Sequence, residues 1–247
     1  MRHNADQTLK TVLLLMILLL VLGLSAARAY KNYSGIIRNI SRKAEDEKYY
    51  EQLRTSASSY SADEKMLRSY DSFLDLAGWV SIPDTDISYP VMSEEEASVG
   101  FYLDHRPDGA SSSYGSLFIP AGNLPSDDNV IIYGHHMRNG SMFGELGKYK
   151  DEEWAHEHRT ITFLTEEGLY SYEVISVFVQ SMASSGYRWE DKISFADDAS
   201  KEEYRQKITA LSMFRLEDGH REYTRFITLV TCDYSVPEGR VVVVGAL

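Results

Sequence analysis

Short apolar segments, separated by turn residues, run from residue 79 to the end of the chain and constrain the fold most strongly. They are rich in the β-branched and aromatic residues that strands prefer. Many short strands at this spacing predict a closed barrel or a sandwich with added helices. The expected strands are 79–82, 87–92, 116–119, 129–133, 160–164, 169–180, 223–231 and 240–245.

Two helix starts stand out in the chain. Ser61 is followed three residues later by Glu64, and Ser200 is followed in the same way by Glu203. This spacing is typical of a capping box, in which the two side chains satisfy free amide groups at the start of a helix. We expect the first helix to end at Gly78, and the second to precede the strand at 223–231.

An unbroken apolar run occupies residues 12–24. With its flanks it reaches about 25 Å as a helix, near the short limit for crossing a membrane. The small residues that follow also resemble a signal-peptide cleavage site, so a retained anchor and a removed signal peptide are both open. We favour the anchor, because the run is long for a signal core. More Lys and Arg follow the run than precede it, which counts weakly against an extracellular domain.

These patterns predict three parts of the chain. Residues 1–29 form a cytoplasmic tip and a transmembrane signal anchor, and residues 30–65 form a helical stalk. Residues 66–247 form the catalytic domain. The net charge of −12 and the pI near 5.0 argue against nucleic acid as a partner, since phosphate contacts need clustered Lys and Arg.

The chain has one cysteine, Cys232, which excludes an intramolecular disulfide and a cysteine-based zinc cluster. Cys232 ends a strongly apolar strand, where a nucleophile would be held rigidly and still be reached. A thiol attacks as the thiolate, which a nearby cation stabilises. Arg240 begins the next strand, and an antiparallel pairing would bring it beside Cys232. The alternative is that Arg240 only covers a sheet edge.

Histidine supplies the second candidate for this chemistry. The apolar strand 129–133 is followed by Gly134, His135 and His136. His135 could act as general acid and base, with His136 as its rival. Adjacent residues usually point in different directions, so only one of the two should face the thiol.

Metal and cofactor chemistry find little support. His156 and His158 could join other histidines at a zinc ion, but their spacing suits a strand rather than the helix that this charged segment predicts. No HExxH, GxSxG or phosphate-binding glycine loop occurs. We therefore expect no metal and no cofactor.

Taken in order, these motifs resemble the sortase family. Tyr133-Gly134-His135, the 228–232 strand end and Arg240 carry the resemblance, and the segments 78–80 and 140–144 point to class B. The resemblance covers about residues 67–247. It implies a mainly β fold: an eight-stranded sortase-type β-barrel with N-terminal helices and a helix before the catalytic strand.

The resemblance also implies roles for the site. Cys232 would attack the carbonyl after Thr in an LPXTG-like sorting signal, and His135 would serve as acid and base. Arg240 would bind substrate carbonyls and stabilise the oxyanion. The neighbouring residues expected to line the substrate groove are Thr231, Leu229 and Tyr234.

The implied partners are surface proteins that carry a C-terminal sorting signal and an amine acceptor of the cell wall. The implied location is the cell membrane, with one span and an extracellular catalytic domain. Two alternatives remain: a cysteine hydrolase that passes the acyl group to water, and a membrane-anchored binding module without activity.

Overall fold

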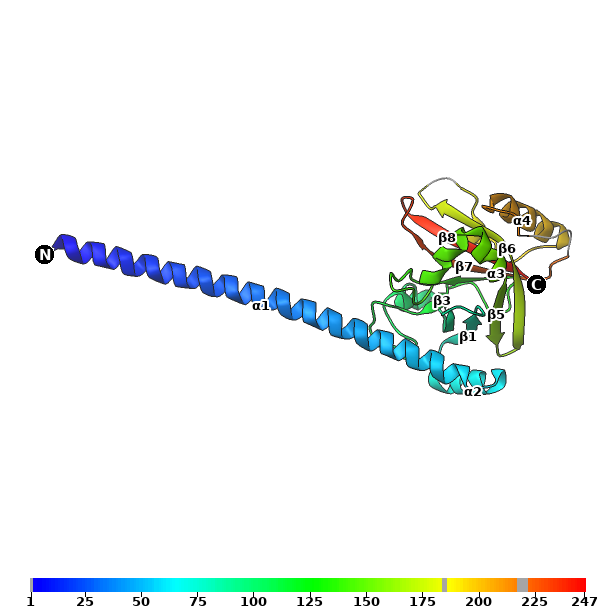
Figure 1. Cartoon of the computed structure of the whole chain (residues 1–247), viewed down its shortest axis with the longest axis horizontal. Helices are drawn as coiled ribbons and strands as arrows, with labels where there is room; N and C mark the ends of the chain where they lie inside the picture. The colour runs from blue at the N-terminus through cyan, green and yellow to red at the C-terminus, as the bar shows by residue number, and fades with distance from the viewer. Residues whose placement is uncertain (1, 184–185, 217–221) are drawn as a thin grey trace. The chain divides into compact units, whose positions relative to one another are not determined.

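The computed structural model describes residues 2–183, 186–216 and 222–247. It divides into two compact units, Met1–Glu47 and Lys48–Leu247. The described residues of the first unit, from Arg2 onward, are all helical. The second contains every strand and the last turns of the first helix (Figure 1).

Helix α1 (Arg2–Ser58) contains the apolar run. Its side chains from Leu13 to Leu22 are all more than half exposed, and one window of the helix reaches a mean hydropathy of 2.2. A helix that is apolar on every side and covered by no protein is suited to lipid. Among the described residues, this helix alone is long and apolar enough to cross a membrane.

Helix α2 (Ala62–Ser72) begins as predicted, because the Ser61 side chain accepts a hydrogen bond from the amide of Glu64. The predicted end was wrong: the helix ends at Ser72, and Gly78 lies within a strand. A Cβ atom at Gly78 would lie 2.5 Å from the carbonyl oxygen of Leu164. This glycine therefore allows two strands to approach closely and does not end a helix.

The eight strands close into a barrel in the order β1-β2-β3-β4-β7-β8-β6-β5, which confirms the predicted class of fold. β5 pairs with β1 to complete the ring, and the β4–β7 and β2–β3 pairs are parallel. The strands are β1 (Leu76–Ser81), β2 (Ser88–Ser93), β3 (Leu117–Ile119), β4 (Asn129–Tyr133), β5 (Thr160–Thr165), β6 (Gly168–Ser181), β7 (Phe226–Asp233) and β8 (Gly239–Ala246).

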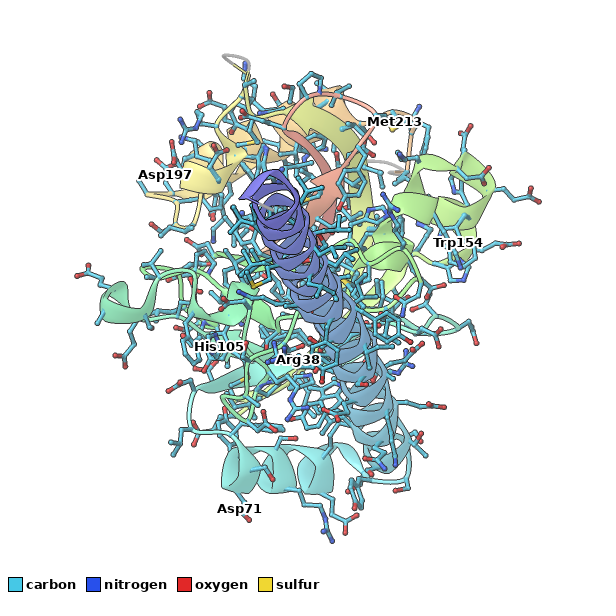
Figure 2. All side chains as sticks on the ribbon, turned by 90° about the vertical axis from the view of Figure 1, so that its left-hand side faces the viewer. Arg38, Asp71, His105, Trp154, Asp197 and Met213 are labelled. Carbon is cyan, nitrogen blue, oxygen red and sulfur yellow. The ribbon has the colours of Figure 1, made fainter. Side chains whose placement is uncertain are left out.

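Short helices lie in the connections between these strands. They are η1 (Glu96–Ser98), η2 (Phe101–Leu103), η3 (Gly144–Lys150), α3 (Glu152–Glu157), η4 (Trp189–Asp191) and α4 (Asp198–Leu211). The capping box of α4 was predicted at Ser200 and Glu203, three residues later than the structure has it. Asp197, labelled in Figure 2, is the cap and accepts from the amide of Ser200, whose hydroxyl accepts from the amide of Asp197.

Side chains on the strands alternate between two apolar layers, as the strand period requires. All eight strands contribute to the barrel interior. There β4, β7 and β8 contribute Val130, Ile132, Ile227, Leu229, Val241 and Val243. The intervening residues form an outer layer beneath α4 and η4, made by Ile131, Phe226, Val230, Val242 and Val244. The face that any residue of these strands occupies follows from this alternation.

Candidate active site

Cys232 lies near the end of β7, directly opposite Arg240 at the start of β8. It is two residues beyond Val230, and Arg240 is two residues before Val242; both of these valines belong to the outer layer. Because alternate residues share a face, the thiol and the guanidinium group both lie on the outer face of the barrel. The strand pairing expected from the sequence is therefore present, and both side chains are partly exposed.

The end of β4 runs parallel to β7 and reaches the same place. Tyr133 pairs with Val230, and the amide of Gly134 donates to the carbonyl of Val230 at 3.1 Å. The hydroxyl of Thr231 donates in return to the carbonyl of Gly134 at 2.8 Å. These two bonds carry the chain onward beside β7, so that His135 and His136 follow at the level of Cys232.

Gly134 is required at this point by packing. A Cβ atom there would lie 2.2 Å from a methyl carbon of Leu117 and 2.7 Å from the ring of Phe143. Real Cβ atoms do not approach other atoms so closely, and a larger residue would displace the backbone that carries His135.

The two histidines make different contacts. Nε2 of His135 lies 2.7 Å from the carbonyl oxygen of Leu103, and Nδ1 of His136 lies 2.9 Å from the carbonyl oxygen of Cys232. A carbonyl oxygen only accepts, so each of these nitrogens carries a hydrogen. In the neutral His135 ring, Nδ1 is then the atom that can take up a proton. His136 instead ties the end of β4 to the backbone of the cysteine.

Arg240 brings positive charge to the outer face. Its guanidinium donates to the carbonyl of Gly239 at 2.9 Å, and it forms no ion pair with the described residues. Burial raises the pKa of the neighbouring Tyr133 to about 12; Glu190 adds to this rise and Arg240 opposes it. The charge of Arg240 therefore acts on Tyr133 on this face of the barrel.

The three residues expected to bind substrate occupy different environments. Leu229 is 0% exposed in the barrel interior, so it is a core residue and cannot contact a peptide on the outer face. Thr231 is 2% exposed, and its hydroxyl is bonded to Gly134. Tyr234 is 75% exposed, and its ring lies edge-on to that of His136 at 5.5 Å between centroids. Of the three, only Tyr234 presents its side chain to solvent.

One ion pair beside the cysteine involves no residue that the sequence predicted for the site. Asp233, next to Cys232, is buried on the inner face and accepts from the ammonium group of Lys150 at 2.6 Å. Burial alone would raise the pKa of Asp233, but hydrogen bonds from Lys150 and Ser235 outweigh it and hold the pKa below its usual range. An acidic residue directly after an apolar strand was the signal available in the sequence.

The histidines considered for zinc lie elsewhere. His156 is in α3, and the ring of His158 stacks on Trp154 of that helix (labelled in Figure 2) with 3.7 Å between centroids. Among the described residues, no three His, Cys, Asp or Glu side chains are arranged to hold a metal ion.

A closed barrel, in which a cysteine pairs with an arginine beside the strand end that precedes a histidine, defines a β-barrel cysteine enzyme. The sequence model of the protein family described as the sortase domain matches residues 80–247. The chain therefore belongs to the sortase family. Sortase B of Listeria monocytogenes is 34% identical over 177 residues, which cover 70% of each chain. These relatives place the present chain in class B. It is a sortase-type cysteine transpeptidase of cell-wall sorting.

Solved structures agree with this assignment. Sortase B of Clostridium perfringens is 27% identical with a TM-score of 0.64, covering 72% of this chain and 97% of that one. The Staphylococcus aureus sortase B–substrate complex has a TM-score of 0.69 at 22% identity, covering 85% of this chain and 97% of that one. The second likeness concerns the fold alone.

Proposed function

We propose that this enzyme cleaves an LPXTG-like sorting signal after Thr and joins the acyl group to an amine of the cell wall. The observation that carries the proposal is the pairing of Cys232 with Arg240 on the outer face, beside the strand end that bears His135. Membership of the sortase family supports the class of substrate. The substrate-bound S. aureus relative shares the same barrel.

The residues would act in two steps. The thiolate of Cys232 attacks the carbonyl carbon of Thr, and Arg240 stabilises the negative charge that develops on its oxygen. The peptide C–N bond then breaks, and His135 gives a proton to the leaving amine. The acceptor amine, losing its proton to His135, attacks the thioester carbon. The C–S bond breaks and the thiolate is restored.

We also propose that the apolar part of α1 anchors the enzyme in the membrane, with the second unit outside the cell. The apolar side chains of this helix support the proposal, since those from Leu13 to Leu22 are all more than half exposed in the part of the chain that the structure describes. Protease added to intact cells should degrade residues 48–247 and spare the anchor. Full protection of those residues would contradict the orientation.

The function is tested with residues 30–247 and a panel of LPXTG, NPXTX and SPXTG peptides, with and without an added amine. Mass spectrometry should find cleavage after Thr and an amine adduct, and Cys232→Ala should give neither. Release of the free acid alone, with amine in excess, would instead indicate a hydrolase. If no peptide reacts, labelling of Cys232 by a thiol-reactive substrate analogue would separate an untested motif from an inactive binding module.

A further inference from the structure

The loop between His135 and Gly144 closes on itself through backbone contacts. The amide of Phe143 donates to the carbonyl of His135 at 3.0 Å, and His136 pairs with Met142 as an isolated antiparallel bridge. Met142 and Phe143 are buried in the interior layer. The backbone of Met142 has a φ of 55°, a left-handed conformation that a methionine adopts only when its surroundings hold it there.

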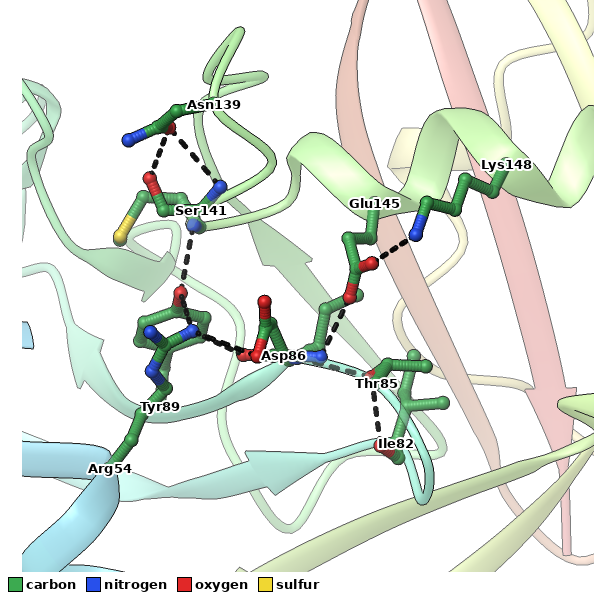
Figure 3. A network of polar contacts seen from close by, with 11 residues as sticks. Arg54, Ile82, Thr85, Asp86, Tyr89, Asn139, Ser141, Glu145 and Lys148 are labelled. Atoms are coloured by element: carbon green, nitrogen blue, oxygen red, sulfur yellow. Dashed lines mark hydrogen bonds and ion pairs between the residues drawn. The ribbon is translucent and has the colours of Figure 1, made fainter. Parts of the chain in front are cut away.

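Tyr89 of β2 supplies one such contact. Its phenol oxygen accepts a hydrogen bond from the amide of Met142 at 3.0 Å and a second from Nη1 of Arg54 at 3.3 Å (Figure 3). Arg54 belongs to the last turns of α1, within the compact unit that begins at Lys48. One fully buried oxygen atom therefore joins the end of α1 to the loop that carries the histidines.

A second tyrosine makes a parallel connection. The side-chain amide of Asn139 donates to the phenol of Tyr114 at 2.9 Å, and the Tyr114 ring stacks on Tyr50 of α1 with 6.2 Å between centroids. Tyr50 also lies edge-on to Tyr89, at 5.8 Å, and donates to the carbonyl of Gly115. The helix end thus touches both tyrosines that hold the loop.

Arg54 is itself fixed by the turn between β1 and β2. Nη1 donates to the carbonyl of Asp86 at 3.1 Å and lies 3.6 Å from its carboxylate. The amide of Asp86 donates to the carboxylate of Glu145 at 2.7 Å, just beyond the loop (Figure 3). The guanidinium group therefore sits in a network whose two ends both reach the segment that follows His135.

We propose that Tyr89 is a positioning residue, and that through it the docked end of α1 holds the histidine loop in its catalytic conformation. Residues 48–58 are then part of the support of the active site rather than a passive link to the membrane. The expected effect of Tyr89 on turnover rests on the proposed function. The coupling between the end of α1 and the histidine loop is independent of it.

The test compares Tyr89→Phe, Arg54→Met and a matched control in the full chain, held in detergent micelles. Tyr89→Phe removes one oxygen atom and keeps the ring, which leaves the buried amide of Met142 without its acceptor. The control is Tyr204→Phe, another buried phenol, which accepts from Asn129 at 3.1 Å. Asn129 begins β4, about 13 Å along the strand from the histidine end.

Hydrogen exchange of the peptide 135–143 is the first readout. We expect exchange about tenfold to a hundredfold faster in Tyr89→Phe and a smaller rise in Arg54→Met, with no local change in Tyr204→Phe. Turnover of the sorting peptide is the second readout. Tyr89→Phe should lower kcat about tenfold with KM within about twofold of wild type, because Arg240 and the outer face are untouched.

The outcomes separate the coupling of helix and loop from the catalytic role of Tyr89. Unchanged exchange in Tyr89→Phe or in Arg54→Met, or an equal rise in Tyr204→Phe, would overturn the coupling. Faster exchange with unchanged kcat would overturn the positioning role. If the wild-type chain turns over no peptide, the proposed function fails, while the exchange of 135–143 still decides whether helix and loop are coupled.

Discussion

Replacing Asp233 by Asn should destabilise the enzyme in a pH-dependent way. The carboxylate is buried, with its side chain 1% exposed, and it accepts from Lys150 and from the amide of Ser235. Asn keeps the shape and an acceptor for Ser235, but it loses the charge that pairs with Lys150. The substitution therefore isolates one charge-assisted hydrogen bond beside Cys232.

The magnitude follows from the exposure of the two partners. A hydrogen bond between charged groups contributes about 1.5–3 kcal/mol. The Lys150 side chain is 35% exposed, so solvent screens the pair and about 1–2 kcal/mol remains. For a unit of this size each kcal/mol shifts Tm by about 2–4 °C. We expect Tm to fall by about 2–8 °C at pH 7.

The sign of the pH dependence is fixed by the lowered pKa of Asp233 in the folded state. Such a group stabilises the fold above its unfolded pKa, which is about 4, and this contribution is lost as pH falls through the folded value. The gap in Tm between wild type and Asp233→Asn should thus be complete at pH 7 and shrink below about pH 4.

Thermal unfolding followed by circular dichroism at pH 7, 5 and 3.5 measures this gap. Asp191→Asn is the control, since its partner Arg188 lies 3.5 Å away and both side chains are more than half exposed. It should change Tm little at any pH. A gap for Asp233→Asn that is absent at pH 7, or undiminished at pH 3.5, would refute the reasoning.

Two further substitutions test the site. Gly134→Ala should cost about 1–3 kcal/mol in urea unfolding, because its methyl group meets Leu117 and Phe143, and transpeptidation should fall as His135 is displaced; a stable, fully active variant would contradict the packing argument. Arg240→Gln should lower kcat/KM about 10²- to 10³-fold by removing the cation, while iodoacetamide still labels Cys232; unchanged kcat/KM would exclude the oxyanion role.

Local sequence signals were sufficient for β4 but not for β7. The bounds 129–133 were predicted correctly, because the strand is framed by polar residues and by Gly134. β7 was expected at 223–231 but spans Phe226–Asp233. Its last two residues remain in the sheet because they pair with Arg240 and Gly239, whereas strand propensity alone does not extend the strand past Thr231.

Part of the candidate site could likewise be predicted from local sequence signals. The pairing of Cys232 with Arg240 follows from two strands and a short turn. Leu229 could have been excluded, since it is three residues from Cys232 and the strand period of two puts them on opposite faces. The bond from Met142 to Tyr89 joins segments 53 residues apart and depends on the closed barrel, so no pattern in the chain predicts it.

The parallel pairing of β4 with β7 has a consequence for how activity is acquired. Asn129 pairs with Phe226, so almost a hundred residues separate the two paired strands along the chain. Contacts between such distant segments form late and slowly in folding. A partly folded chain therefore has its thiol and its histidine apart, and the nucleophile is assembled only as the barrel closes. The onset of turnover during refolding should consequently report the last structural event rather than the first.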